Sequence, residues 1–310
     1  MNPHVNIVFV CFNCGQDIQQ AISDIVQGDY PLDKLSITVV DNASQDNSVK
    51  LLTSIDCIDV NVIESTENVG FGSGCNLAIS QVNGGDKVLL LNPDIRLNVD
   101  SISKLIEYSN ETPEALIWGG KTLDENGNVD GKNAWKEPSL SGVISWSFFG
   151  DILFKKLGLS IPDAYSEKEL FASDSVDAIS GCFFLIDLNL LKQLGGFDEQ
   201  FFMYSEEVDL CRRARELGAQ PKSTTSATIV HIGSKTITSR NKLNFLYESK
   251  LKYFKKHWSP LKFYVARVSL FLGSFLRLVL ISSASLFMAS KRNDRSIWFE
   301  FVKNQLSWRF

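Results

Sequence analysis

Three acidic side chains crowd the start of one expected helix. Glu206, Glu207 and Asp209 stand within "YSEEVDLCRRARELG", directly after the apolar stretch "GGFDEQFFMY" and after Ser205, a plausible N-cap. Acids in a first helical turn often only complement the helix dipole. Like charges this close, however, raise one another's pKa, which suits a group that must accept a proton near neutral pH. The cluster therefore indicates a general base.

A second set of polar residues follows successive apolar runs. Asp41 and Asn42 end one run in "VVDNASQD", and the segment "NVGFGSGCN" (68–76) sets three glycines between Asn68 and Asn76 at the start of a helix. A strand-end carboxylate can accept a hydrogen bond from N3–H of uracil or thymine, although Asp and Asn are also ordinary cap residues. Glycines allow a sugar or phosphate to approach the backbone closely, and a merely flexible loop is the alternative.

A third set ends the most apolar run of the chain. In "LLLNPD" the run Val88–Leu91 leads straight into Asn92, Pro93 and Asp94. Asn-Pro-Asp is good turn chemistry. A carboxylate at the C-terminal end of a buried strand also stands where open α/β sheets place their ligands. We therefore expect these three segments to meet at one edge of one sheet.

Three familiar motifs are not supported. "GFGSGC" (70–75) lacks the last glycine of the dinucleotide fingerprint, and its strand-end acid precedes the glycines. "GGKT" (119–122) lacks the upstream glycine of a phosphate-binding loop. "CFNC" (11–14) is a lone Cys-x-x-C with no second pair or nearby histidines, so neither zinc nor redox chemistry is favoured.

The elements that must position these residues alternate along the first 120 residues. Near-continuous apolar runs, typical of strands covered on both faces, occur at 5–11, 35–40, 60–63, 87–92 and 115–120. Helix-like stretches separate them, so the rhythm predicts an α/β fold with a mostly parallel central sheet flanked by helices. Beyond Gly120 the rhythm fails. Residues 121–175 show no strong period, and the later elements expected are a strand at 176–187, a helix from Ser205 to about Leu217 capped by Gly218, and a strand at 226–232.

From about Val5 to Thr236 the sequence resembles the family-two glycosyltransferases with a GT-A fold, in particular the bacterial rhamnosyltransferase-like branch. The segments that carry the resemblance are "VVDNAS", "NVGFGSGCN", "LLLNPD", "GGFDEQFFMYSEEVDLCRR" and "HIGSKT", in the family's order. The resemblance implies a nucleotide-sugar donor, a divalent metal and inversion at the anomeric carbon. It implies that Asp41 reads the pyrimidine base and that Asn13 and Asn68 lie near the donor.

The same resemblance suggests further roles. The residues expected to bind the donor are Asn13, Asp41, Asn42, Asn68, Gly70, Asn76 and Asn92. Asp94 takes the place of the last acid of the family's D-x-D metal motif, whereas Asn92 replaces the first acid. One carboxylate and the donor pyrophosphate are sufficient for Mg²⁺ or Mn²⁺, and His231 could supply a further ligand, with a structural role as the alternative. Glu207 falls where the family places its catalytic acid, as Glu instead of Asp, and Glu206 and Asp209 are supporting candidates for acceptor binding.

The C-terminal region has a different character. Residues 249–310 carry 12 Lys and Arg against Asp294 and Glu300, although the whole chain has a net charge of −5. The stretch 263–289 is strongly apolar, but Arg267 and Arg277 interrupt it, and its uncharged run of 13 residues (278–290) is short of the roughly 20 needed to cross a bilayer. A basic, apolar, Trp-flanked segment suits an anionic membrane surface rather than nucleic acid. A helical hairpin that packs on the catalytic domain or on a partner subunit is the alternative.

These observations lead to one expected organisation and function. Residues 1–240 form the catalytic domain, with a nucleotide-sugar-binding half (1–120) and an acceptor or catalytic half (121–240), and residues 241–310 form a helical, basic C-terminal extension. The expected enzyme is cytoplasmic, without an N-terminal signal sequence, and peripheral on the inner face of the membrane. It moves L-rhamnose from the dTDP-activated sugar, or another hexose or galactofuranose from a UDP-sugar, to a saccharide or a polyprenyl-diphosphate-linked acceptor.

Two other function classes stay open. A nucleotidyltransferase would carry a basic Gly-rich loop after the first strand, where the chain reads "CFNCGQD". A non-catalytic nucleotide-sugar-binding module would not need the acids of "EEVD".

Overall fold

The structure, a computed structural model, describes residues 2–129, 131, 133–166, 169–170, 173–233, 239–286, 288 and 291–309. The chain divides into two compact units. The first comprises Met1–Glu137, Tyr165–Phe202 and Glu206–Thr236, and the second comprises Pro138–Ala164, Met203–Ser205 and Ile237–Phe310. The second unit thus adds an internal segment, Pro138–Ala164, to the C-terminal helices that the sequence separates by composition.

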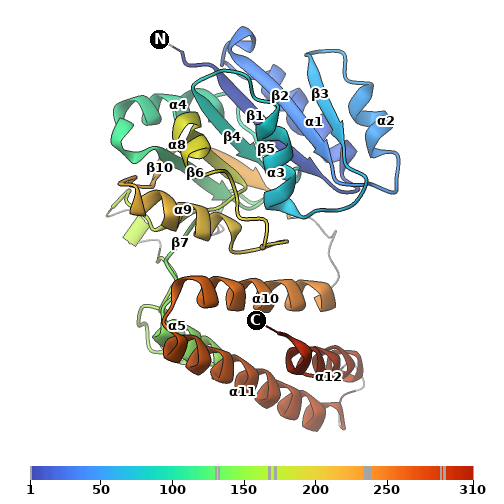
Figure 1. The fold of residues 1–310 in the computed structure, drawn as a ribbon, viewed down its shortest axis with the longest axis vertical. Helices are drawn as coiled ribbons and strands as arrows, with labels where there is room; N and C mark the ends of the chain where they lie inside the picture. The colour runs from blue at the N-terminus through green and yellow to red at the C-terminus, as the bar shows by residue number, and fades with distance from the viewer. Residues whose placement is uncertain are drawn as a thin grey trace. The chain divides into compact units, whose positions relative to one another are not determined.

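The first unit is built on an eight-stranded sheet with the order β3-β2-β1-β4-β9-β6-β10-β5 (Figure 1). Its strands are β1 (Val5–Cys11), β2 (Leu35–Asp41), β3 (Val60–Glu64), β4 (Lys87–Leu91), β5 (Ile95–Leu97), β6 (Ile117–Leu123), β9 (Phe183–Asp187) and β10 (Lys222–His231). Neighbours β1, β2, β3 and β4 run parallel, as do β6 and β10, whereas β9 is antiparallel to β4 and β6, and β5 is antiparallel to β10. The carboxyl ends of β1, β2, β4, β6 and β10 therefore share one edge.

Both faces of the sheet are covered, as the apolar runs predict. Along β1, Ile7 and Phe9 point to one hydrophobic cluster and Val8 to the other, because successive side chains in a strand alternate between faces. The first cluster includes side chains of α1 (Gly15–Val26), α2 (Ser48–Thr53) and α4 (Ser101–Glu111). The second includes those of α3 (Phe71–Ser80), α8 (Leu188–Gln193) and α9 (Glu206–Glu216).

The structure departs from the sequence prediction beyond Gly120. The strand expected at 176–187 is broken into β8 (Ala178–Ile179), which pairs with β7 (Ala134–Trp135), and β9, because the chain turns at Gly181 and Cys182. The last strand begins at Lys222, four residues before the expected start, and carries an irregularity between Ser223 and Thr228. Short β5 has no pattern of its own, and it is placed by its pairing with the end of β10.

The second unit is helical. It contains α5 (Leu140–Ser147), α6 (Gly150–Lys156), α10 (Ser239–His257), α11 (Pro260–Ser285) and α12 (Lys291–Ser307). Its interior is aromatic, with Tyr247 and Phe301 fully buried in an edge-to-face pair at 4.6 Å between ring centroids. Within the described residues, α11 is the one helix long and apolar enough to cross a membrane, judged by length and composition alone. This helix is longer than the uncharged run 278–290, because it begins at Pro260 and includes Arg267 and Arg277.

Candidate functional site

Asp41 stands at the carboxyl end of β2 with one carboxylate oxygen available for a ligand. The residue is only 3% exposed, and its Oδ2 accepts a hydrogen bond from Ser44 N at 3.0 Å. Its buried Oδ1 has no hydrogen-bond partner among the described residues. A buried acceptor without a partner is costly, so a donor such as a ring N–H would satisfy it. This geometry fits the expected role of Asp41 in reading a pyrimidine base.

The loop after β1 lies beside the loop after β2. The two strands are paired through Cys11 and Asp41, so the residues that follow them meet. Asn13 N donates to Ser44 Oγ at 2.9 Å, and Asn13 Oδ1 accepts from Gln45 N at 2.7 Å. Asn13 and Ala43 both have positive φ, 56° and 62°, an uncommon conformation for residues with a side chain that often marks a functional loop. The structure thus brings Asn13 and Asp41 together through Ser44.

Asn42 and Asn68 shape the glycine loop. Asn42 Nδ2 donates to Asn68 Oδ1 and to Gly70 O, both at 3.0 Å, while Asn42 Oδ1 accepts from Val69 N at 3.0 Å. Asn68 Oδ1 also accepts from Gly70 N at 3.0 Å. The side-chain amides of Asn42 and Asn68 therefore stabilise the turn that leads into α3 through hydrogen bonds within the protein.

The glycines of this loop are explained by packing within the protein. A Cβ at Gly70, where φ is +88°, would lie 2.1 Å from Phe202 O, and one at Gly74 would lie 2.9 Å from a methyl group of Val10. At Gly72 a Cβ would meet the Phe197 side chain at 3.1 Å. The glycines let the 197–202 segment and β1 approach α3. Contact of Gly70 with a donor stays a prediction.

Asp94 and His231 come together at the same sheet edge. Ile95 pairs with His231 in the antiparallel β5–β10 register, which sets the residue before β5 beside the end of β10. Asp94 Oδ2 lies 3.5 Å from His231 Nε2, with both side chains about 15% exposed or less. Asn92 precedes them, and its backbone N donates to Cys182 O at 3.3 Å.

This pair fits a divalent cation that keeps other ligands. A carboxylate and an imidazole suit Mn²⁺, and a carboxylate suits Mg²⁺, when phosphate oxygens and water complete the shell. Among the described residues no group of three His, Cys, Asp or Glu side chains is close enough to hold a metal ion by itself. The protein therefore offers part of a coordination shell, which a diphosphate would have to complete.

The acids of α9 lie in two different environments. Glu206 is buried next to α3, and its Oε2 has no hydrogen-bond partner among the described residues. Burial, followed by the charge of Glu207, raises the pKa of Glu206 well above its usual range. Glu207 is partly buried, and loss of solvation raises its pKa, which a polar contact with the half-buried Trp135 indole partly offsets. Glu207 is thus the better placed of the two to exchange a proton with a ligand.

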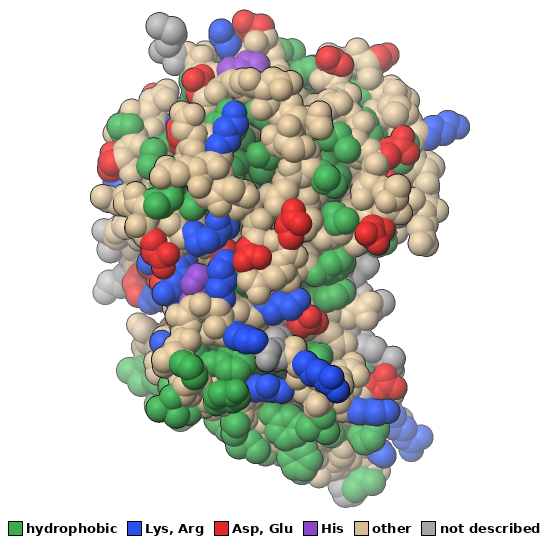
Figure 2. Space-filling view, viewed as in Figure 1, with side chains coloured by type: hydrophobic (Ala, Val, Ile, Leu, Met, Phe, Trp, Pro, Cys, Tyr) green, Lys and Arg blue, Asp and Glu red, His purple; other side chains and the backbone are tan. Residues whose placement is uncertain are grey.

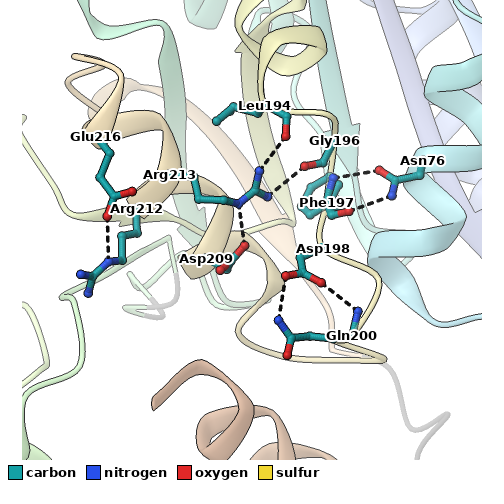
Figure 3. Close-up of polar contacts among 10 residues, drawn as sticks. All are labelled: Asn76, Leu194, Gly196, Phe197, Asp198, Gln200, Asp209, Arg212, Arg213 and Glu216. Atoms are coloured by element: carbon teal, nitrogen blue, oxygen red, sulfur yellow. Dashed lines mark hydrogen bonds and ion pairs between the residues drawn. The ribbon is translucent and has the colours of Figure 1, made fainter. Parts of the chain in front are cut away.

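Asp209 is occupied by an internal ion pair (Figure 3). Its carboxylate is fully buried and accepts from Arg213 Nε at 2.8 Å. The same guanidinium donates to Leu194 O and Gly196 O, each at 2.9 Å. This clamp ties α9 to the turn that precedes it.

Asn76 fixes that turn from the other side. Its Nδ2 donates to Phe197 O at 2.9 Å, and its Oδ1 accepts from Phe197 N at 2.8 Å (Figure 3). Asn76 therefore connects α3 with the segment that leads to Glu206 and Glu207.

The expected site residues fall into three groups in the structure. The first group comprises Asn13 and Asp41, joined through Ser44, and the hydrogen-bonded set of Asn42, Asn68 and Gly70 that follows in the chain. Asp94 and His231 form the second group, and the α9 acids, held in place by α3 and Asn76, form the third. Sequence reasoning missed Ser44, Trp135 and Arg213. Trp135 gives no signal because β7 has only two residues, whereas Arg213 could have been found, since it follows Asp209 at i+4.

The comparisons with known proteins agree with this geometry. Residues 6–194 match the family described as glycosyl transferase family 2. The chain is 26% identical over 243 residues to the N-acetylglucosaminyl-diphospho-decaprenol L-rhamnosyltransferase of Mycobacterium tuberculosis. This match covers 74% of this chain and 76% of that protein. It is 31% identical over 158 residues to rhamnosyltransferase WbbL of Escherichia coli K12, with 49% of this chain and 56% of that protein covered.

Solved structures share the fold. The mannosyltransferase PcManGT from Pyrobaculum calidifontis, solved with GDP-Man and Mn²⁺, superposes with a TM-score of 0.59 at 14% identity, covering 99% of this chain and 87% of that one. The predicted GT-A fold class and the predicted glycosyltransferase activity are confirmed by these matches.

Proposed function

The chain belongs to glycosyl transferase family 2, and we propose that it is an inverting enzyme that transfers L-rhamnose from a dTDP-activated donor. The observation that carries this proposal is the arrangement at one sheet edge of a buried unpaired acceptor at Asp41 and a carboxylate–imidazole pair at Asp94 and His231. The identity of the sugar rests on the two rhamnosyltransferase relatives. Another hexose or a galactofuranose, carried by UDP, is the alternative donor sugar.

The nucleotide is recognised by the first half of the catalytic domain, residues 1–120. Asp41 Oδ1 accepts the N3–H of uracil or thymine, which removes the cost of a buried acceptor without a partner. Asn13 lies beside it through Ser44, while Asn42 and Asn68 hold the loop that leads into α3. Cytosine lacks this N3–H and would set its N3 acceptor against the carboxylate of Asp41.

Asp94 and His231 would hold a divalent metal, Mg²⁺ or Mn²⁺, together with the donor diphosphate. When bound, such an ion neutralises the charge that grows on the leaving diphosphate. Asn92, at the start of the same turn, adds a polar side chain near the diphosphate without adding negative charge. A site with one acid, Asp94, repels the negatively charged donor less than a D-x-D motif with two acids would.

The transfer step uses the second half of the catalytic domain, residues 121–240. The acceptor oxygen attacks the anomeric carbon as the bond from that carbon to the diphosphate oxygen breaks, so the configuration inverts. Glu207 takes the proton of the acceptor hydroxyl, and its raised pKa suits this task near neutral pH. The products are the glycoside and the nucleoside diphosphate. Asp209 acts indirectly, because its ion pair with Arg213 fixes the helix that carries Glu207.

The acceptor is a saccharide carried on a polyprenyl diphosphate, as the name of the mycobacterial relative indicates for that protein. An acceptor of this kind is held in a membrane, so the enzyme works as a peripheral protein on the cytoplasmic face. Residues 241–310 serve as the extension that brings the catalytic domain to this surface. The product would enter a cell-surface polysaccharide such as an O-antigen.

A panel of nucleotide sugars tests this proposal. The purified protein is incubated with dTDP-, UDP- and GDP-sugars, a lipid-linked acceptor and Mn²⁺, and both free nucleotide and glycosylated lipid are measured. The proposal predicts acceptor-dependent release of dTDP or UDP. A nucleotidyltransferase would release pyrophosphate from a nucleoside triphosphate instead, and a binding module would release nothing. Either of those outcomes would replace the proposed function.

A further inference from the structure

Helix α11 presents apolar side chains on its exposed face. Its exposed residues recur at intervals of three and four, so they line one side of the helix. The apolar members of this stripe are Leu261, Tyr264, Val265, Val268, Leu272, Phe275, Leu276, Val279 and Leu280. Over 26 residues the helix extends about 39 Å at 1.5 Å per residue. An exposed apolar surface of this length marks an interaction site.

Both arginines and Ser274 of α11 point into the second unit instead. Arg277 donates to Ser147 O and Trp146 O, each at 2.6 Å, and Arg267 donates to Trp308 O at 2.9 Å. Ser274 is fully buried and its Oγ accepts from Gln305 Nε2 at 2.9 Å. Both arginines of α11 thus turn inward, beside buried Phe263 and Leu270, and leave an exposed face that is mostly apolar, unlike that of a helix on a water-soluble surface.

The segment α5–α6 adds to the same kind of surface. Ile152, Leu153 and Leu157 are each more than half exposed, and Lys155 and Lys156 lie among them. Gly273 of α11 packs against α5 so closely that a Cβ there would lie 2.5 Å from Ser147 O. Figure 2 shows apolar side chains gathered over the second unit, with Lys and Arg side chains beside them. Two segments far apart in sequence thus form one apolar, basic-rimmed unit.

We propose that the exposed stripe of α11, together with α5–α6, is a lipid-binding face that lies in the plane of an anionic leaflet. This inference deepens the proposed membrane location, since it names the surface and adds an internal segment to the C-terminal extension. The apolar side chains enter the boundary between headgroups and acyl chains, and the exposed lysines and arginines contact lipid phosphates.

The charge of this unit selects an anionic leaflet over other occupants. Residues 249–310 carry 12 Lys and Arg against two acids, so a second copy docked on the same face would set like charges opposite one another. A crossing orientation of α11 is also disfavoured. Helix α12 packs along α11, and its exposed Arg292, Arg295 and Lys303 would then enter the hydrocarbon.

Flotation of the full chain with preformed vesicles tests the proposal. The vesicles contain phosphatidylcholine either alone or with phosphatidylglycerol. We expect the wild type to float with the anionic vesicles and far less with the neutral ones. The double variant Leu272→Glu, Phe275→Glu should lose about tenfold or more of this binding, because two charges enter the apolar stripe. It should keep its wild-type affinity for UDP or dTDP.

A matched control separates location from charge. Val99→Glu with Leu217→Glu adds the same two charges at exposed apolar positions of the first unit, and this variant should float like the wild type. The proposal is overturned if the wild type stays at the bottom with anionic vesicles, or if both double variants float equally. It is also overturned if the wild type is a dimer while the α11 double variant is a monomer that no longer floats. None of these readouts uses the transfer reaction, so failure here is distinct from failure of the proposed function.

Discussion

The carboxylate of Asp94 and the imidazole of His231 lie 3.5 Å apart, between Oδ2 and Nε2, although they come from different halves of the catalytic sequence. Their proximity follows from the antiparallel pairing of β5 with the end of β10, which sets Ile95 opposite His231. The turn Asn92-Pro93-Asp94 therefore does more than reverse the chain. It sets a carboxylate beside an imidazole where the sheet ends.

Asp94→Asn should abolish turnover while the fold stays intact. The amide cannot supply the anionic oxygen that a hard divalent cation requires, so the leaving diphosphate loses its counter-charge. EDTA should have the same effect on the wild type, and added Mn²⁺ should reverse it. Calorimetry should show that Mn²⁺ no longer strengthens UDP or dTDP binding to the variant. Asp33→Asn, an exposed carboxylate of the same unit, is the control. Full activity of both the Asp94→Asn variant and the EDTA-treated wild type would contradict the proposal that Asp94 holds a metal ion.

Asp41 should make binding depend on the N3–H group of the base. A hydrogen bond to a charged group contributes about 1.5–3 kcal/mol, so Asp41→Ala should weaken UDP or dTDP binding by roughly tenfold or more. N3-methyl-UDP, which lacks this N–H, should bind poorly to the wild type. It should bind the variant about as well as UDP does. A variant that still discriminates between the two nucleotides by calorimetry would locate base recognition elsewhere.

Glu206→Gln should stabilise the protein at alkaline pH. Burial raises the pKa of Glu206 in the folded state, so its contribution to stability is fully present below the ordinary Glu pKa and is lost as pH rises toward the folded pKa. The glutamine side chain removes this loss. At pH 8 the melting temperature of the variant should therefore exceed that of the wild type, by about 2–4 °C for each kcal/mol gained in the free energy of unfolding. At pH 4 the two melting temperatures should be equal. An equal difference at both pH values, or none beyond that of Glu216→Gln, contradicts the assignment.

Arg213→Met should destabilise the first unit. It would remove the ion pair between Arg213 and the fully buried carboxylate of Asp209, together with the hydrogen bonds that the guanidinium donates to Leu194 O and Gly196 O. Removing one partner of a buried ion pair costs about 3–5 kcal/mol in the free energy of unfolding. Urea denaturation should show this loss, whereas Lys192→Met on an exposed position of α8 should change stability little. A loss below 1 kcal/mol would mean that the clamp is not structural.

Much of the sheet can be predicted from the sequence, because strands covered on both faces are continuous apolar runs. Strands β1 to β4 begin and end within a residue or so of the expected positions. The antiparallel direction of β9, which lies within the strand expected at 176–187, could not be predicted, since strand direction is set by partners that the local pattern does not contain. The break between Ile179 and Phe183 has the same origin, because β8 pairs with β7 outside the main sheet. The short strand β5 is not predicted at all.

The candidate site is a mixed case. The acids and amides of "VVDNAS" and "LLLNPD" could be selected because polar residues directly after buried strands lie at a sheet edge, and the acids of "EEVD" because three of them crowd one helical turn. Their partners could not be selected. Trp135 lies beside Glu207 through a two-residue strand, and Gly70 is required by the backbone of Phe202, a contact between distant segments.

The most direct test of the account compares Glu207→Gln with Glu216→Gln on the same helix. The first change keeps the side-chain shape at the proposed base and removes the proton acceptor, and the second alters an exposed acid near the end of α9. Steady-state transfer to the acceptor and calorimetric binding of the nucleotide are measured for both. Glu207→Gln should lower kcat by about 10²–10⁴ with nucleotide affinity nearly unchanged, while Glu216→Gln behaves as the wild type. Near-normal turnover in Glu207→Gln would contradict the proposal that Glu207 accepts the proton in sugar transfer.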